Sequence, residues 1–374
     1  NSIAEWDGAA WQPLGTGLGG MNNHLEGVEC LVTLPGGDLV VGGRFASAGG
    51  VAVDNIARWD GTTWSPIGVA VGNAAASLRA MVVMPNGDLI VGGYFDSIAG
   101  VPALNIARWD GVTWGPLGGG VGGPGANGCR APWVSPDGAL VATGFSEAGG
   151  QAARVARWDG AAWTPIGSLP QGVGLELLFE PNGDLLVAGT FWFSGSYDNQ
   201  PLWRWNGQVW SAVGPLMQNG LYALEMDALL RQGGDVLAGG TFGTAPGVSV
   251  PNLARWNGSS WSPLGGGTDG RVRAMLQLPD GDVLVGGEFV HAGGLIRPAL
   301  ARLGTTCPAT VTTIGATCAS ASGPMQLTID ALPWTGGAFA STCTGIDPSA
   351  VAFSLFGFSS PGVALSALHP LGAP

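Results

Sequence analysis

The sequence predicts an all-β fold built from repeated four-stranded sheets, and three features predict it. A Trp followed by Asp-Gly or Asn-Gly recurs with gaps of 53, 50, 49, 47 and 51 residues. Each repeat holds four short apolar runs separated by Gly, Pro, Asn or Asp, and no window shows the sustained 3.6-residue period of an amphipathic helix. A four-stranded repeat of about fifty residues is typical of a β-propeller blade. The repeated tryptophans are Trp6, Trp59, Trp109, Trp158, Trp205 and Trp256.

The second repeat shows the elements of one blade in order. The first strand is expected over 78–84, followed by the turn Pro85-Asn86-Gly87-Asp88, in which Pro presets φ and Gly supplies a left-handed residue. An apolar run over 89–91, closed by Gly92-Gly93, suits a second strand buried on both faces. The third and fourth strands are expected over 105–109 and 114–117. Asp110-Gly111 joins them as a tight hairpin.

The number of blades depends on how the ends of the repeat array meet. Six pairs of first and second strands are present, and the N-terminal residues supply a third and a fourth strand. If residues 11–14 become the outer strand of the last blade, a ring of six blades closes. If an upstream strand pair is missing from this sequence, the full-length ring has seven. We expect six blades in this sequence. The number matters because an unclosed ring leaves an edge strand open to pairing with another chain.

Composition excludes several classes of function. The chain has 26 acidic and 14 basic residues, a net charge of −12, and every basic residue is Arg. No basic patch exists to neutralise a phosphate backbone, so nucleic acid is not an expected partner. No apolar run reaches the roughly 18 residues of a membrane helix. The Gly-rich loops do not precede helices and the three His are dispersed, so we expect no cofactor and no metal site.

The C-terminal segment differs from the repeats in its cysteine content. Cys307, Cys318 and Cys343 fall within 305–374, whereas 1–304 holds Cys30 and Cys129. This density predicts a small, disulfide-containing β-module, truncated at its end, in an oxidising compartment. The sequence begins within a repeat, so an upstream piece, such as a cleaved signal, is expected to be missing. We therefore expect a propeller over 1–304, a module over 305–374, and an extracellular or cell-surface location.

The repeat resembles a known family. Gly-Gly after an apolar strand, an aromatic-Asp turn, and Trp five residues later, as in Gly42-Gly43, Trp59-Asp60 and Trp64, resemble the kelch repeat. The pattern is similar also to the propeller repeats of fungal cortical polarity markers and of secreted proteins from planctomycete-like bacteria. Residues 356–362 resemble part of the C-terminal module of those bacterial proteins. Kelch-type propellers include oxidases, lyases and binding scaffolds, so the resemblance implies a fold and leaves the function open.

Two recurring side chains are candidates for binding but favour a structural role. An Arg precedes most of the repeated tryptophans, and we expect each to pair with a turn carboxylate rather than to bind an anion. A second Trp lies five residues after the first, and we expect cross-strand packing rather than stacking on sugars. The structural set comprises Arg58, Arg108, Arg157, Arg255, Trp59, Trp64, Trp109, Trp114, Trp158, Trp163, Trp256 and Trp261.

The fourth repeat departs from the pattern in the connection between its second and third strands. Trp192, Tyr197 and Asp198 stand in this longer connection, and Trp203 follows it. Aromatic and amide groups in a loop predict a ligand patch, and the alternative is an insertion that only repairs the blade.

The sequence favours a secreted, non-enzymatic propeller that binds a protein or a glycan or displays it at the surface. No Gly-x-Ser-x-Gly motif and no cluster of Tyr and His are present to support a serine hydrolase or a copper oxidase. The rival is a polysaccharide hydrolase or lyase whose acids gather over the central channel, which needs two carboxylates within roughly 5–9.5 Å. A scaffold stabilised by calcium on acids such as Asp198 and Asp269 is a third possibility.

Overall fold

A computed structural model describes most of the chain. The described residues are 3–7, 10–20, 27–67, 76–123, 128–192, 200–214, 224–245, 248–304, 319–320, 323–324, 326–331 and 340–344. The chain divides into two compact units, Asn1–Thr305 and Thr306–Pro374. Within the described residues, no helix is long and apolar enough to cross a membrane.

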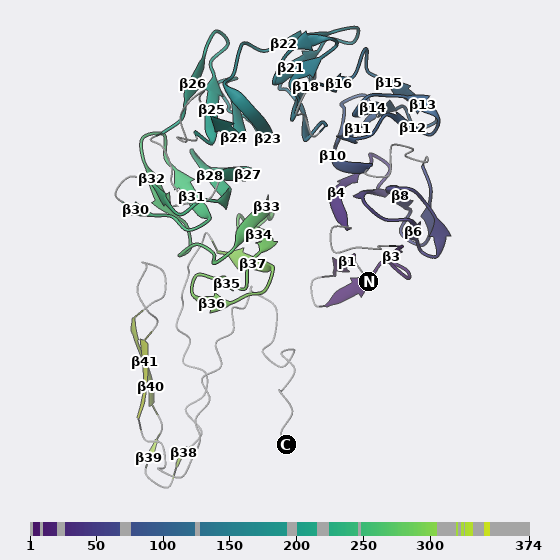
Figure 1. Ribbon diagram of the computed structural model, residues 1–374. Coiled ribbons are helices and arrows are strands. Elements are labelled where there is room, and N and C mark those ends of the chain that lie inside the picture. Colours follow the sequence, from purple (N-terminus) through teal and green to yellow (C-terminus); the bar gives the residue numbers. More distant parts are fainter. Residues whose placement is uncertain are drawn as a thin grey trace. The chain divides into compact units, whose positions relative to one another are not determined.

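The first unit is a series of antiparallel sheets in chain order, five with four strands and a sixth with three (Figure 1). Their strands are β4 (Val28–Thr33), β5 (Leu39–Gly43), β8 (Ile56–Trp59) and β9 (Trp64–Ser65); β10 (Ser77–Val83), β11 (Leu89–Tyr94), β14 (Ile106–Trp109) and β15 (Trp114–Pro116); β17 (Ala131–Val134), β18 (Leu140–Thr143), β21 (Val155–Trp158) and β22 (Trp163–Pro165); β23 (Gln171–Phe179), β24 (Leu185–Trp192), β25 (Leu202–Trp205) and β26 (Trp210–Ala212); β27 (Glu225–Gln232), β28 (Asp235–Thr241), β31 (Leu253–Trp256) and β32 (Trp261–Pro263); β33 (Arg271–Gln277), β34 (Val283–Glu288) and β37 (Leu300–Leu303).

Short two-residue strands decorate the connections between the second and third strands of five sheets. The sequence did not predict these hairpins, because two residues are too few for an apolar pattern. They are β6 (Ser47–Ala48) and β7 (Val51–Ala52); β12 (Ser97–Ile98) and β13 (Val101–Pro102); β19 (Glu147–Ala148) and β20 (Gln151–Ala152); β29 (Thr244–Ala245) and β30 (Val248–Ser249); β35 (His291–Ala292) and β36 (Leu295–Ile296). Two more short strands precede the first strands of the first and third sheets: β3 (Leu18–Gly19) pairs with β6, and β16 (Val121–Gly122) pairs with β19.

The hairpin after each repeated Trp forms where the sequence predicts it. In the second sheet the carboxylate of Asp110 accepts hydrogen bonds from the N–H groups of Val112 and Thr113, at 2.9 and 2.7 Å. This Asx turn adds to the backbone hydrogen bond from the N–H of Asp110 to the carbonyl of Thr113, at 3.2 Å, and closes the hairpin in which Trp109 lies opposite Trp114. Asp60, Asp159, Asn206 and Asn257 form the same turn in the other sheets.

A β-bulge in the first strand explains the second Gly of the Gly-Gly pair. Opposite Gly92 and Gly93, the register of β10 slips by one residue between Leu78 and Ala80. A Cβ on Gly93 would lie 2.1 Å from the carbonyl oxygen of Ser77, so only Gly allows the two backbones to approach. Equivalent register shifts occur in β4, β23, β27 and β33.

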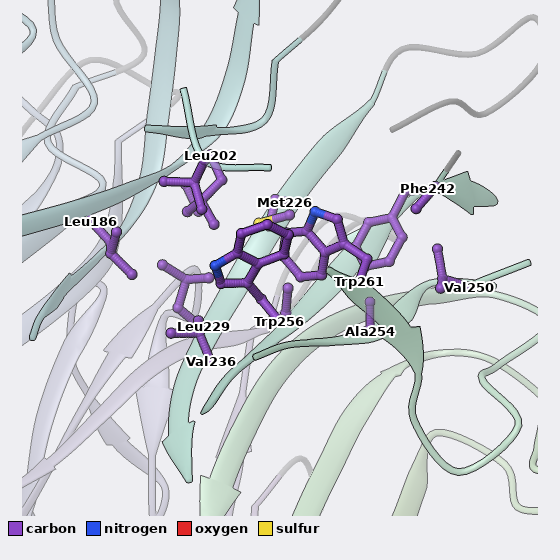
Figure 2. Close-up of a cluster of buried hydrophobic side chains, with 14 of the residues drawn as sticks. Leu186, Leu202, Met226, Leu229, Val236, Phe242, Val250, Ala254, Trp256 and Trp261 are labelled. Carbon is purple, nitrogen blue, oxygen red and sulfur yellow. The ribbon is translucent and has the colours of Figure 1, made fainter. Parts of the chain in front are cut away.

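The first strand of every sheet lies on the inner side of the unit. Each is an edge strand of its sheet, and β4, β10, β17, β23, β27 and β33 contact one another in that order. Apolar clusters fill the spaces between neighbouring sheets. Figure 2 shows the cluster between the fourth and fifth sheets, where Trp256 and Trp261 pack with Leu186 and Leu202. Burial of one such side chain stabilises the fold by about 1.5–3 kcal/mol.

The N-terminal hairpin does not close the sixth sheet as the sequence predicted. Strand β2 (Trp11–Pro13) pairs with β1 (Ala4–Trp6), with Trp6 opposite Trp11. The described part of the last sheet consequently has three strands, β33, β34 and β37, instead of four. The local hairpin repeats the Trp–Asp-Gly–Trp pattern of the other sheets, and a tight hairpin closes at a lower entropic cost than pairing between the two ends of the unit.

The second unit contributes two short hairpins to the described residues. Strand β38 (Ala319–Ser320) pairs with β39 (Gly323–Pro324), and β40 (Gln326–Ala331) pairs with β41 (Ala340–Thr344). Cys307 and Cys318 lie outside the described residues, so the predicted disulfide stays a prediction.

Candidate functional site

The bulges place one extra residue on the inner strand of five sheets, and the third sheet has an equivalent residue just before its first strand. The residue at this position is charged in five of the six sheets. A bulged residue has no partner on the neighbouring strand, and its side chain breaks the regular alternation of side chains between the two faces of the sheet. In the third sheet the equivalent residue directly precedes β17 and donates its N–H to the carbonyl oxygen of Thr143 at 2.9 Å. In chain order the residues at this position are Glu29, Arg79, Arg130, Leu175, Asp227 and Arg273.

Charged side chains from the six sheets converge on the inner side of the unit. Arg130, in the third sheet, lies within electrostatic range of Arg79 and Glu29 from the first two sheets. It also lies within range of Glu225 and Asp227 from the fifth. Residues far apart in sequence thus share one electrostatic environment. We call the following set the inner charge cluster: Glu29, Arg79, Arg130, Glu176, Glu225, Asp227 and Arg271.

One side of the cluster is a tight ion-pair network. Arg271 donates from Nε to Oδ2 of Asp227 at 2.7 Å and from Nη2 to Oδ1 at 2.5 Å. The same guanidinium forms an ion pair with Glu225. The side chain of Asp227 is 9% exposed, so this bidentate contact joins β27 to β33 in a partly desolvated environment. These carboxylates are committed to Arg271.

The opposite side of the cluster is richer in positive charge. Arg79 forms an ion pair with Glu29, whose Oε2 lies 3.9 Å from Nε of the guanidinium. Burial lowers the pKa of the Arg79 guanidinium, Glu29 opposes this effect, and the positive charge of Arg44 adds to it. Positive charge thus accumulates between the first and third sheets.

Arg130 differs from the other cluster cations in forming no ion pair within the described residues. Its Nε is buried and makes no hydrogen bond, and no acidic side chain within the described ranges forms an ion pair with it. Burial lowers the pKa of the Arg130 guanidinium, and the charge of Arg79 lowers it further. A partly buried guanidinium without a partner is unfavourable in the free protein.

Glu176 is the acid whose position departs from the repeat. Residues at the same place in the other first strands are Cys30, Ala80, Ala131, Ala228 and Ala274, all small. Glu176 is half-buried and its Oε1 accepts a hydrogen bond from the N–H of Leu177 at 3.1 Å. Burial raises the pKa of its carboxyl from 4.5 to about 8, and the charge of Asp227 adds to this rise against that hydrogen bond. Glu176 therefore carries its proton at neutral pH.

The cluster combines three chemical capacities. Arg79 and Arg130 can bind an anion, protonated Glu176 can donate a hydrogen bond or a proton, and the carboxylates around Arg271 can accept hydrogen bonds. No three His, Cys, Asp or Glu side chains among the described residues are grouped to hold a metal. The side chains of the cluster themselves offer polar recognition, with proton transfer from Glu176 as a further capacity.

Each Arg that precedes a repeated Trp lies against an acid of its own sheet. Arg58 contacts Asp38 at 2.7 Å, Arg157 contacts Asp137 at 2.7 Å, and Arg108 pairs with Asp88. Arg255 lies 3.5 Å from Asp235, whereas Arg204 contacts Glu180 at 2.8 Å and lies 3.9 Å from the expected Asp184. The purely structural role of these arginines stays a prediction.

The paired tryptophans face each other across the outer hairpins. Ring centroids are 5.2 Å apart for Trp59 and Trp64, and between 5.2 and 6.3 Å apart for Trp109–Trp114, Trp158–Trp163, Trp205–Trp210 and Trp256–Trp261. The second Trp of a pair donates its indole N–H to a carbonyl of the preceding repeat, as Trp163 does to Leu117 at 3.0 Å. Trp261 is the exception, because its N–H has no partner among the described residues.

The ligand patch expected in the fourth repeat lies mostly outside the described residues. Tyr197, Asp198 and the side chain of Trp192 fall outside them. Trp203 is buried in the cluster between the third and fourth sheets, and its N–H donates to the carbonyl of Gln200 at 3.1 Å. The patch stays a prediction. Asp269, an expected calcium ligand, accepts hydrogen bonds from the backbone N–H groups of Val290 and His291.

Sequence reasoning missed the inner charge cluster, although a signal for it was present. The bulge residue changes sign from sheet to sheet, so it forms no motif of the usual kind. Alignment of the first strands would have shown a charged residue recurring next to an apolar position. The same alignment would have shown Glu176 replacing a small residue.

The comparisons with known proteins address the fold. A family described as a domain of unknown function (DUF5122) beta-propeller matches residues 85–109 and 278–305, which hold the second and third strands of the second and sixth sheets. The chain contains a β-propeller. No curated protein matches the sequence. The kelch-type resemblance stays a prediction.

Solved structures of low sequence identity match three quarters or more of the chain. Virginiamycin B lyase from Staphylococcus aureus is 10% identical with a TM-score of 0.47, covering 75% of this chain and 85% of that one. YCF48 bound to D1 peptide is 16% identical with a TM-score of 0.46, covering 80% and 84%. The extracellular domain of the putative hybrid two component system BT3049 from B. thetaiotaomicron is 12% identical with a TM-score of 0.49, covering 78% of this chain and 35% of that one.

Proposed function

We propose that this protein is a non-enzymatic binding propeller that takes part of a protein or glycan ligand at the inner charge cluster. One observation carries the proposal: Arg130, a partly buried guanidinium with no ion-pair partner among the described residues, sits among charges from several sheets. Folding alone gives no reason to retain such a group, because a neutral side chain would be less costly there. A ligand that pairs with the Arg130 guanidinium would explain why the group is retained.

The proposal includes an extracellular or cell-surface location. It rests on the three cysteines of 305–374 and on the scarcity of charged residues, 11% of the chain. A scaffold that displays a ligand-binding propeller at the surface needs no catalytic group, and the repeated Arg and Trp side chains have structural partners.

The test is binding of the purified full chain to glycan and peptide arrays. Wild type is compared with the double variant Glu29→Gln/Arg79→Gln, which removes one ion pair from the cluster and leaves the net charge unchanged. The matched control is Asp280→Asn/Arg302→Gln, which removes an exposed ion pair of the sixth sheet. We expect wild type and control to bind the same ligands and the cluster variant to lose them. Equal binding by all three proteins would refute the assignment of the site.

A second candidate function is hydrolysis of a polysaccharide, and Glu176 favours it. A carboxyl that stays protonated at pH 7 beside a second carboxyl, Asp227, is the arrangement that glycosidases use. Glu176 would give its proton to the leaving glycosidic oxygen. Asp227 would have to exchange a hydrogen bond with Arg271 for one with the attacking water before it could take the proton of that water. Product release from a polysaccharide panel by wild type, lost in Glu176→Gln, would support hydrolysis. Absence of products from wild type would exclude it for that panel.

A further inference from the structure

The cationic side of the inner charge cluster has the features of a site for a single small anion. The two other cations of the cluster have carboxylate partners, Arg79 with Glu29 and Arg271 with Asp227. Arg273, outside the cluster, pairs with Glu288 at 3.0 Å. Arg130 has no such partner within the described residues. Two guanidinium groups in electrostatic range of each other, one of them without an ion pair, repel until an anion lies between them.

The surroundings limit the size and charge of that anion. Glu29, Glu225 and Asp227 are all within electrostatic range of Arg130, and the chain carries a net charge of −12. A long polyanion would extend beyond the two arginines and be repelled by the surrounding carboxylates. A single carboxylate matches the planar guanidinium group and adds only one negative charge.

Other groups of the cluster and its surroundings suit a ligand that carries hydroxyl groups. Gly93 accepts a hydrogen bond from the N–H of Cys129 at 2.9 Å, which brings the adjacent Tyr94 alongside the chain at Arg130. Tyr94 is 36% exposed and offers both a ring face and a phenol. Glu176, which lies near Asp227, offers an O–H donor, and a hydroxyl can accept from this donor while donating to a carboxylate.

We propose that Arg79 and Arg130 together bind the carboxylate of a small hydroxylated acid, such as a uronic acid, whose hydroxyl groups face Tyr94 and Glu176. The inference rests on the proposed function, because it names the ligand class of the same site. It also accounts for Arg130 having no ion pair among the described residues, since a structural role would call for a carboxylate from the chain itself.

The test is isothermal titration calorimetry of the full chain at pH 7 with D-glucuronate, D-gluconate, D-glucose and inorganic sulfate. The variant is Arg130→Gln, and the matched control is Arg297→Gln, which removes an Arg whose Nη1 donates to the neighbouring carbonyl of Ile296. We expect the two acids to bind wild type and the control equally. Arg130→Gln weakens them about 10- to 100-fold, which is the loss of one or two charge-assisted hydrogen bonds.

A second readout separates binding from structure. Because Arg130 is unpaired and partly buried, Arg130→Gln should raise the melting temperature of the ligand-free protein, whereas loss of a structural arginine would lower it. A lower melting temperature, unchanged acid binding in Arg130→Gln, or no binding of either acid to wild type overturns the proposal. If glucose binds as tightly as the two acids, the carboxylate has no role in binding. If sulfate binds as tightly as the acids, the site is an unspecific anion site. Either result also overturns the proposal.

These outcomes are distinct from failure of the proposed function. If the acids do not bind but array ligands still depend on Glu29 and Arg79, the inner charge cluster remains the binding site and only the ligand class is wrong. If array binding survives the cluster variant, the proposed function itself fails.

Discussion

Replacement of Glu176 by Gln should stabilise the protein at alkaline pH and leave its stability unchanged at acidic pH. The carboxyl has its pKa raised from 4.5 to about 8 in the folded protein, so the folded chain holds a proton that the unfolded chain loses as the pH rises above 4.5. Wild-type stability from this group is fully present below pH 4.5 and is lost as the pH rises through 8. Gln keeps the size and the hydrogen-bonding capacity of the protonated acid and has no proton to lose.

The size of the effect follows from the pKa. A rise from 4.5 to about 8 corresponds to about 5 kcal/mol of unfolding free energy once the group is ionised. Because the side chain is half-buried and keeps some contact with solvent, we expect about 2–3 kcal/mol. Urea unfolding of both proteins between pH 4.5 and 9, with Glu147→Gln as an exposed control, measures it. A difference between wild type and Glu176→Gln that does not change with pH would refute the reasoning.

Three further predictions concern the scaffold. Gly93→Ala should lower the free energy of unfolding by about 3 kcal/mol, because the new Cβ would lie 2.1 Å from a backbone oxygen. Gly115→Ala, where a Cβ would meet nothing within 4 Å, should change the midpoint of urea unfolding little. Equal midpoints for the two variants would count against the bulge explanation. Trp163→Phe should cost about 1 kcal/mol more than Trp261→Phe in thermal unfolding, because both indoles are buried at the same repeat position and only Trp163 has a hydrogen-bond partner. A reversed order would contradict this account. Burial raises the pKa of the Cys129 thiol, so a thiol reagent should label it in urea but not in the native protein, as mass spectrometry of the peptide would show.

The repeat architecture was predictable because local chemistry determines it. The turn at Asp110-Gly111 needs only an Asx side chain and a Gly, and the structure forms the hairpin between Trp109 and Trp114 there. The expected strand over 105–109 begins one residue later, because Asn105 adopts a left-handed φ of 60°. Its amide bonds to the N–H of Phe95 and the carbonyl of Val121, an interaction between separate segments that no local pattern displays.

The candidate site was not predictable in the same way, because it depends on neighbours contributed by different repeats. Arg130 and Glu225 are 95 residues apart in sequence. The packing of the sheets brings their side chains into electrostatic range of each other. Glu176 looks like an ordinary polar residue until its position is compared with Ala80 in the second sheet. The closure through residues 11–14 was wrong for a related reason, since two pairings competed and the local one prevailed.

The most direct test of the inner charge cluster as the binding site is amide hydrogen exchange of the full chain with and without its array-selected ligand. Protection that appears together in residues 77–83, 128–134 and 225–232, from three different sheets, is the result that the account predicts. Protection confined to residues 185–205 would place the ligand on the fourth sheet, at the patch predicted from Trp192 and Tyr197, and would contradict it.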